Sequence, residues 1–192
     1  MRFTRDGLLT AVIVVLALFL GSQVVQLIPS PEEQFGRPFE HHATVGEAVE
    51  VRTGTLSVNG VQTSREVEIH GQVAATTALW LVVDFEWLAK DRPSPYAASE
   101  VRLLTPDGRT YGGVGPVPVA CFPGQPHITL GCQALIELPA DALEGAVLRF
   151  PAALNSELDD VVIVDLGIDA ARAAELAQPA ERIQLTGPVE QP

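Results

Sequence analysis

Residues 78–89 read ALWLVVDFEWLA and form the most apolar stretch of the chain after residue 28. Successive side chains of a β-strand point to opposite faces. Residues 81, 83, 85 and 87 are all apolar, whereas the alternate set runs from Trp80 to the acidic Asp84 and Glu86. The stretch is also rich in the β-branched and aromatic residues that favour strands. It predicts a central β-strand with one apolar face and one face that becomes polar along its length.

The segments on either side of this strand predict further short strands. Asp107-Gly108 lies between two alternating runs and predicts a tight hairpin turn, because glycine accepts a positive φ. Turn residues separate the runs at regular intervals, and no long helical pattern intervenes, so the sequence predicts an all-β protein and favours a sandwich over a barrel. The predicted strand segments are residues 48–58, 65–71, 78–89, 100–113 (two strands and the turn), 132–139, 146–152 and 161–168.

The N-terminal region contains a long uncharged segment, residues 8–28, with the sequence LLTAVIVVLALFLGSQVVQLI. As a helix it would extend roughly 30 Å, the thickness of the hydrocarbon core of a membrane. Arg2 and Arg5 precede it, so the positive-inside rule places the N-terminus in the cytoplasm and the rest of the chain outside. We expect a single-pass protein of the cell membrane. A cleaved signal peptide is the alternative, and it leaves the domain at the same extracytoplasmic location.

Composition divides the remaining chain into three parts. Residues 29–46 mix prolines, acids and glycines without periodicity and predict a stalk. The last residues begin with an alanine-rich stretch that predicts a short helix ending before Pro179. The predicted organisation is a cytoplasmic N-terminus (1–7), a transmembrane signal anchor (8–28), a stalk (29–46), a β-sandwich (47–168), and a short helix with a flexible tail (169–192).

Cys121 and Cys132 are the only two cysteines of the chain. Both follow the predicted anchor and therefore lie in a compartment where disulfides persist. Their spacing does not match the Cys-x-x-Cys arrangement of redox-active thiols. We therefore predict a structural disulfide between them.

The charge balance excludes one class of partner. The formal net charge is −12 at pH 7, and such a chain repels the phosphate backbone that dominates nucleic-acid affinity. The nucleophile and phosphate-binding motifs G-x-S-x-G, S-x-x-K, P-loop and G-x-G-x-x-G do not occur in the sequence. We expect no nucleic-acid partner and no cofactor.

Three groups of residues are candidate chemical sites. His41 and His42 are adjacent and would point in opposite directions on an extended chain, which does not suit one metal ion. Asp84 and Glu86 share a strand face and could act as a carboxylate pair, but we interpret them as part of a solvated strand surface. The loop acids Glu157, Asp159 and Asp160 do not follow a calcium-loop spacing, and His70 and His127 are expected to be exposed. We therefore predict no catalytic, cofactor-binding or metal site.

The order of several short motifs resembles a known family. They are the apolar strand LVVDFEW (81–87), the hairpin DGRTY (107–111), the turn Pro123-Gly124 and the strand end IELP (136–139). In this order, over about residues 45–168, they resemble the bacterial, actinobacterial-like, membrane-anchored extracytoplasmic immunoglobulin-like domains of unknown function. That family is similar in fold to the secreted immunoprotective antigen of mycobacteria. The resemblance implies an immunoglobulin-like antiparallel β-sandwich without catalytic activity.

These observations predict a non-catalytic, membrane-tethered extracytoplasmic binding or adaptor domain of the cell envelope. Its expected partner is an envelope or integral-membrane protein, for which it would serve as an accessory subunit, and the loops 90–95 and 112–127 are the expected contact regions. One alternative is an envelope hydrolase or metal-binding protein that uses the carboxylates of the exterior domain. Another is that the anchor helix itself docks into a membrane complex through Ala11, Ala17 and Gly21.

Overall fold

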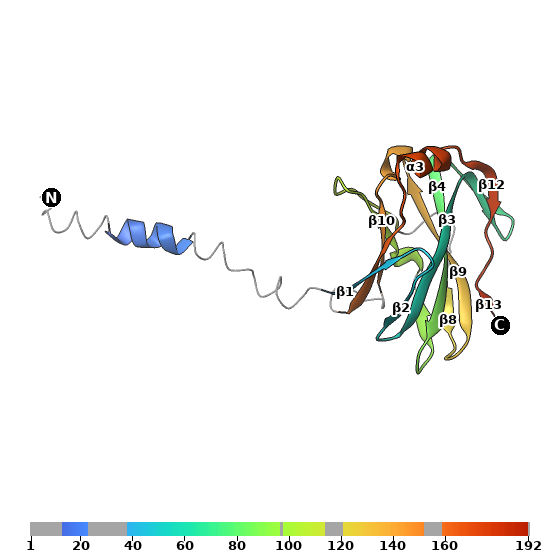
Figure 1. The fold of residues 1–192 in the computed structure, drawn as a ribbon, viewed down its shortest axis with the longest axis horizontal. Coiled ribbons are helices and arrows are strands. Elements are labelled where there is room, and N and C mark those ends of the chain that lie inside the picture. Colours follow the sequence, from blue (N-terminus) through green and yellow to red (C-terminus); the bar gives the residue numbers. More distant parts are fainter. Residues whose placement is uncertain (1–12, 23–37, 97, 114–120, 152–158, 192) are drawn as a thin grey trace, which may run out of the picture. The chain divides into compact units, whose positions relative to one another are not determined.

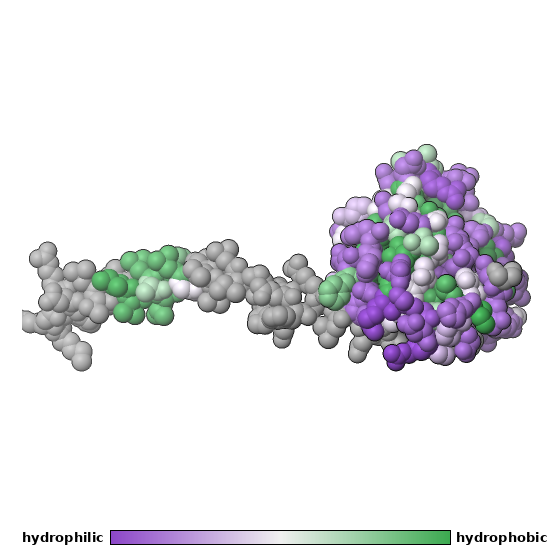
Figure 2. All heavy atoms as spheres, turned by 60° about the horizontal axis from the view of Figure 1, so that its bottom comes forward, coloured by the Kyte–Doolittle hydropathy of each residue, from purple (hydrophilic) through white to green (hydrophobic). Residues whose placement is uncertain are grey.

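The computed structural model describes residues 13–22, 38–96, 98–113, 121–151 and 159–191. The chain divides into two units, residues 1–37 and 38–192. In the first unit, residues 13–22 form a helix with exposed apolar side chains, coloured green in Figure 2. Within the described residues, the structure contains no helix of the length and apolarity needed to cross a membrane. The remainder of the predicted anchor, 8–12 and 23–28, lies outside the described residues.

The second unit is a sandwich of two main β-sheets (Figure 1). The larger sheet has the order β12-β3-β4-β9-β13, with β2 paired to β3, and the smaller has the order β1-β11-β10-β6-β7. Strands β5 (Ser94–Tyr96) and β8 (Cys121–Gly124) form a separate pair. The strands of the larger sheet are β2 (Ala48–Val51), β3 (Gly54–Ile69), β4 (Gln72–Ala89), β9 (Thr129–Leu138), β12 (Ala180–Gln184) and β13 (Val189–Gln191). Those of the smaller are β1 (Phe39–Thr44), β6 (Arg102–Leu104), β7 (Thr110–Tyr111), β10 (Val147–Pro151) and β11 (Asp160–Asp165).

The main core lies between the two sheets and is built on the predicted central strand. The apolar set of β4, which includes Phe85 and Trp87, is buried and faces residues of the smaller sheet such as Phe150. The rings of Phe85 and Phe150 pack edge to face with their centroids 5.3 Å apart, an arrangement that aromatic rings favour. The predicted alternation of this strand is confirmed, and the β-sandwich is confirmed with it.

The other face of β4 supports a second, smaller core. Trp80 and Val82 are buried there with Leu135 of β9 and with Val67 and Ile69 from the far part of β3. The β3–β4 ladder is irregular between these regions: Ser64 pairs with Trp80, but Glu66 already pairs with Ala75. Between these two pairs β4 contains more residues than β3, so the end of the hairpin departs from the regular ladder. Part of the outer face of the larger sheet is thus covered by its own hairpin.

The guanidinium of Arg65 stabilises this irregularity. Its Nη1 donates to the carbonyl oxygens of Thr77 and Ala78, at 2.5 and 2.8 Å. Carbonyl groups that lose their ladder partners need such donors. The sequence predicts two strands, 48–58 and 65–71. The structure instead has a turn at residues 52–53, one long strand, β3, and a second turn at residues 70–71.

The hairpin predicted at Asp107-Gly108 is confirmed. Gly108 has φ +85°, and β6 and β7 pair on either side of the turn. Thr105 N donates to the carbonyl of Arg109 at 3.0 Å, and Gly108 N donates to the carbonyl of Thr105 at 2.9 Å. The tight turn predicted from the sequence is therefore present in the structure.

The structure differs from the predicted stalk at its C-terminal end. Residues 39–44 form β1, which pairs in parallel with β11 from Phe39–Asp160 to Thr44–Asp165. The sequence FEHHAT has little apolar alternation, so its strand conformation comes from hydrogen bonds to β11, more than a hundred residues away. The second unit begins at Pro38 rather than at Glu47.

The structure also differs from the prediction at the C-terminus. Helix α3 (Ala170–Leu176) forms as expected, with the Asp169 side chain accepting a hydrogen bond from Arg172 N at 2.8 Å. The chain after Pro179 is not a free tail, because it forms β12 and β13 on the larger sheet. Leu185, between them, is buried in the second core.

Candidate functional site

An open pocket of about 450 Å³ lies on the smaller sheet at β1, the strand formed by part of the predicted stalk. In the ladder, His42 is opposite Ile163, and Asp165 is opposite both Thr44 and Val147. The pairing of β1, β11 and β10 therefore brings these side chains to one face of the sheet. We call this the β1 pocket, and its lining residues are His42, Ala43, Thr44, Glu47, Val147, Ile163 and Asp165.

The chemistry of the β1 pocket combines an apolar surface with acidic groups. Val147 and Ile163 supply the apolar part. The Glu47 carboxylate accepts hydrogen bonds from Thr44 N at 3.1 Å and from Thr44 Oγ1 at 3.3 Å, both through Oε2. Asp165 Oδ1 accepts from Gly167 N at 2.8 Å. The pocket therefore suits a group that is partly apolar and positively charged.

The start of β1 is held by a charged cluster that joins the two sheets. His41 Nε2 lies 3.1 Å from Asp160 Oδ1, and Asp160 Oδ2 accepts from Arg52 N at 2.6 Å. Arg52, in the turn between β2 and β3, also forms an ion pair with Asp159. The hydrogen bond and the charge of Arg52 lower the pKa of Asp159. This cluster links the β2–β3 turn of the larger sheet to β11 of the smaller one.

We expect Arg52→Ala to weaken the fold most at neutral pH and progressively less in acid. A carboxyl group whose pKa is lowered by folding contributes stability above its unfolded pKa of about 3.9, and this contribution is lost as the pH falls through its folded value. Without Arg52 the pKa of Asp159 returns towards its ordinary value. Urea unfolding of both proteins between pH 7 and pH 2 measures the difference in free energy, which should shrink towards low pH.

The matched control for this prediction is Arg92→Ala, which removes an exposed arginine beside β4. Its effect on the free energy of unfolding should be small and independent of pH. A difference between Arg52→Ala and the natural chain that stays constant down to pH 2 would contradict the role given to the Arg52–Asp159 pair.

Asp84 and Glu86, the candidate carboxylate pair of β4, lie together and accept hydrogen bonds from neutral side chains. Asp84 accepts hydrogen bonds from Gln133 Nε2 at 2.8 Å and from Gln62 Nε2 at 3.2 Å. Glu86 accepts from Asn59 Nδ2 at 2.9 Å. In the part of the chain that the structure describes, no group of three or more His, Cys, Asp or Glu side chains is arranged to hold a metal ion. Glu157, the third of the loop acids, lies outside the described residues.

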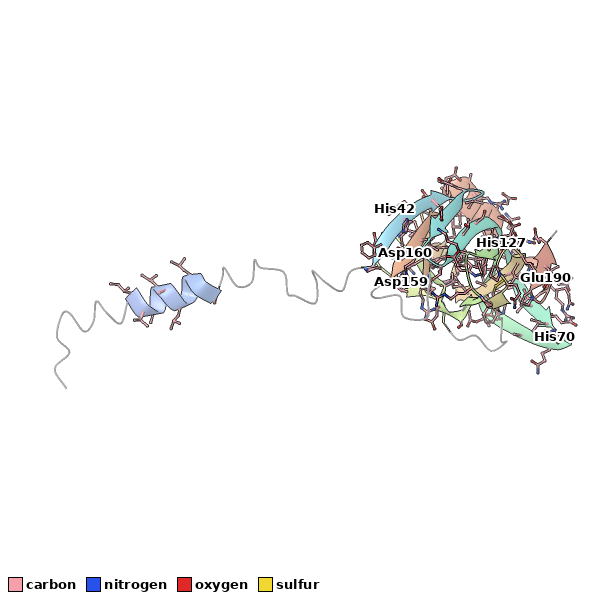
Figure 3. The ribbon with its side chains drawn as sticks, turned by 90° about the horizontal axis from the view of Figure 1, so that it is seen from below. His42, His70, His127, Asp159, Asp160 and Glu190 are labelled. Carbon is pink, nitrogen blue, oxygen red and sulfur yellow. A yellow bond between two sulfur atoms is a disulfide. The ribbon has the colours of Figure 1, made fainter. Side chains whose placement is uncertain are left out.

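The histidines lie in different parts of the sandwich. Figure 3 shows His42 on the same side as Asp159 and Asp160, whereas His70 lies at the far side of the domain and His127 lies between. His70 and His127 are turn residues with positive φ, at 49° and 68°. Both are exposed, as expected. The structure therefore does not bring the four histidines into one site.

Cys121 and Cys132 are joined by a disulfide, with their Cα atoms 5.6 Å apart. Both residues are buried in the main core. The bond links β8 to β9, and Cys132 pairs with Phe85 of β4 in the larger sheet. The pairing that the sequence predicts is therefore present in the structure.

The loops predicted as contact regions are only partly described. Residues 114–120 of the loop 112–127 lie outside the described residues, as do the side chains of residues 94 and 95 at the end of the loop 90–95. The sequence patterns do not indicate the β1 pocket, because they place residues 39–44 in the predicted stalk. The adjacent histidines, His41 and His42, were the one signal in that segment, and they lie on opposite faces of the strand.

The two sheets, their shared core and the disulfide define an all-β sandwich protein. No protein-family model matches the chain, and no curated protein matches it. It is similar to an uncharacterized β-sandwich protein from Clostridium difficile 630, with 13% identity and a TM-score of 0.45, covering 72% of this chain and 99% of that one. It is also similar to the yjhA protein from Bacillus subtilis, with 11% identity and a TM-score of 0.42, covering 64% and 99%. Both likenesses are weak, so the fold assignment rests on the sheet pairing of this chain.

Proposed function

We propose that this protein is a non-catalytic, immunoglobulin-like binding domain of the bacterial cell envelope, tethered to the membrane by residues 8–28. The strand order supports the immunoglobulin-like assignment. Strands β3-β4-β9 correspond to A-B-E of that fold, and β11-β10-β6-β7 correspond to G-F-C-C′. The exposed apolar side chains of residues 13–22 support the tether, since such a surface is stable in lipid and not in water.

The observation that carries the binding role is the β1 pocket. It is open to solvent, it combines apolar and acidic side chains, and it lies beside the edge strand of a sheet, where sandwich domains commonly bind partners. The partner we propose is an envelope or integral-membrane protein that inserts a basic side chain between Glu47 and Asp165. The carboxamide partners of Asp84 and Glu86 give no reason to prefer the hydrolase alternative.

Site-specific photo-crosslinking in intact cells tests this function. A photoreactive amino acid at His42, in the pocket, should form an adduct with one defined envelope protein. The same amino acid at Gln72, an exposed position near the turn of the β3–β4 hairpin, serves as the positional control. The charge reversal Glu47→Lys with Asp165→Lys should reduce the His42 adduct at least about tenfold, because it replaces attraction by repulsion across the contact.

Two further variants distinguish a contact in the β1 pocket from a general effect of net charge and from docking by the helix. Glu144→Lys with Asp91→Lys changes the net charge equally at exposed positions outside the pocket and should leave the adduct unchanged. Replacing residues 8–28 by an unrelated span should also leave it unchanged, whereas its loss would assign docking to the helix. Equal adducts from His42 and Gln72, or an adduct that survives the reversal in the pocket, would contradict the proposal.

A further inference from the structure

The C-terminal segment is bound to the larger sheet in the manner of an extended peptide ligand. Strand β12 pairs in parallel with β3 from Ala180–Ser64 to Gln184–Glu68. The next residues continue the contact, as Leu185 N donates to the Glu68 carbonyl at 2.7 Å and Thr186 N donates to Gln133 Oε1 at 2.9 Å. Strand β13 then pairs with β9 at residues 129–131. The segment therefore runs from an edge of β3 to an edge of β9.

Two side chains of this segment make specific contacts. Arg182 forms ion pairs with Glu66 at 2.6 Å and with Glu68 at 3.3 Å. Leu185, 4% exposed, is packed in the second core with Trp80, whose indole N–H is buried and without a hydrogen-bond partner among the described residues. We call the surface formed by Glu66, Glu68 and Trp80 the β12 face. It binds a positively charged side chain and, three residues later in the segment, an apolar side chain.

The segment covers this face only thinly. Between Ala180 and Gln191, Leu185 is the single buried residue, and most of the others are exposed. The two ladders comprise only the short strands β12 and β13. Ile183 adds a partly buried apolar contact to the second core. A cover that depends on one buried and one partly buried apolar residue, two short ladders and partly exposed ion pairs can open locally while the main core remains folded.

We propose that this face is a docking surface for an extended segment of a partner protein that carries an arginine three residues before a leucine. Residues 180–186 of the chain occupy the surface as an internal substitute for that segment. The partner adds a parallel strand to β3, places its arginine between Glu66 and Glu68, and inserts its leucine beside Trp80 and Val82. This mode of recognition combines main-chain hydrogen bonds for affinity with side-chain pockets for specificity. It concerns a surface separate from the β1 pocket and does not depend on it.

The test uses the full chain and a fluorescent synthetic peptide, PAERIQLTGPVEQ, that copies residues 179–191. Fluorescence anisotropy measures its binding to the natural chain and to Leu185→Asp, which displaces the chain's own segment and leaves the face intact. The variant should bind the peptide at least about tenfold more tightly, because apparent affinity rises with the fraction of molecules in which the face is free. Leu185→Ala, a milder change, should give a smaller increase in the same direction. Val189→Asp, at an exposed position of the same segment, is the matched control and should bind like the natural chain.

Specificity is tested by exchanging charges. In the Leu185→Asp chain, Glu66→Lys with Glu68→Lys should abolish binding of the peptide, and a peptide with Arg182→Glu should restore it. A peptide with two residues inserted between the arginine and the leucine should not bind. Circular dichroism confirms that each variant remains folded.

Three results would overturn the proposal. The first is equal binding of the peptide by the natural chain, Leu185→Asp and Leu185→Ala. The second is binding of the peptide that is insensitive to the charge exchange. The third is a stable dimer of the natural chain, detected by light scattering and dissociated by the peptide. That result would assign the face to the C-terminal segment of a second copy of this chain.

Discussion

Replacing Trp87 by alanine is expected to lower the free energy of unfolding by about 3–5 kcal/mol, the usual cost of removing a large aromatic side chain from a close-packed core. Trp87 is 0% exposed and lies against Gly54, where an added Cβ would come within 2.7 Å of its ring. The neighbouring backbone is therefore already close to the ring. A domain with a total stability of about 5–15 kcal/mol would be left only marginally folded.

Urea unfolding followed by far-ultraviolet circular dichroism measures this effect, since the substitution removes one of the two tryptophan fluorophores. Trp87→Phe keeps an aromatic ring and should cost less than Trp87→Ala. Thr55→Ala, at a half-buried position of the adjacent strand β3, should change the free energy only slightly. A loss below about 1 kcal/mol for Trp87→Ala would show that the site can collapse around the missing ring, contrary to the packing described above.

Removing the disulfide by Cys121→Ala with Cys132→Ala is expected to cost about 2–3 kcal/mol. The bond closes a loop with a sequence separation of 11 residues, and in the loop-entropy model such a cross-link restricts the unfolded chain by about that amount. The same urea measurement compares the natural chain, the variant, and each of them with a thiol reductant. The reductant should destabilise the natural chain and leave the variant unchanged.

The control for this prediction is a single substitution, Cys121→Ala, which breaks the bond but leaves one thiol in the core. Its free energy of unfolding should lie close to that of the double variant, because the lost cross-link dominates both. If the reductant has no effect on the natural chain, or if the double variant is as stable as the natural chain, the bond does not stabilise the fold in solution.

Local patterns were sufficient for the elements whose conformation depends on nearby residues. The strict alternation of residues 81–87 predicts which side of β4 is buried, because every second side chain of a strand faces the same way. The hairpin at Gly108 follows from turn chemistry within a few residues of sequence, and the helix α3 follows from the alanine-rich composition of its own segment. The pairing of Cys121 with Cys132 follows from their being the only two cysteines.

Long-range pairing decided the features that the sequence assigned wrongly. Strand β1 has little periodicity of its own and forms because its backbone groups find partners in β11. Leu185 lies in a polar segment, and its burial depends on the face that Trp80, Val82 and the irregular hairpin create. Neither contact has a local signature in the sequence.

The two candidate binding surfaces show the same division. The amino-acid sequence by itself determined the sandwich, its central strand, its hairpin and its disulfide. Only the tertiary structure brought His42, Glu47 and Asp165 into one pocket and placed Arg182 between Glu66 and Glu68. The physical reason is that side-chain alternation and turn chemistry act over a few residues, whereas a binding surface is assembled from strands whose neighbours are chosen by hydrogen bonding and burial across the whole chain.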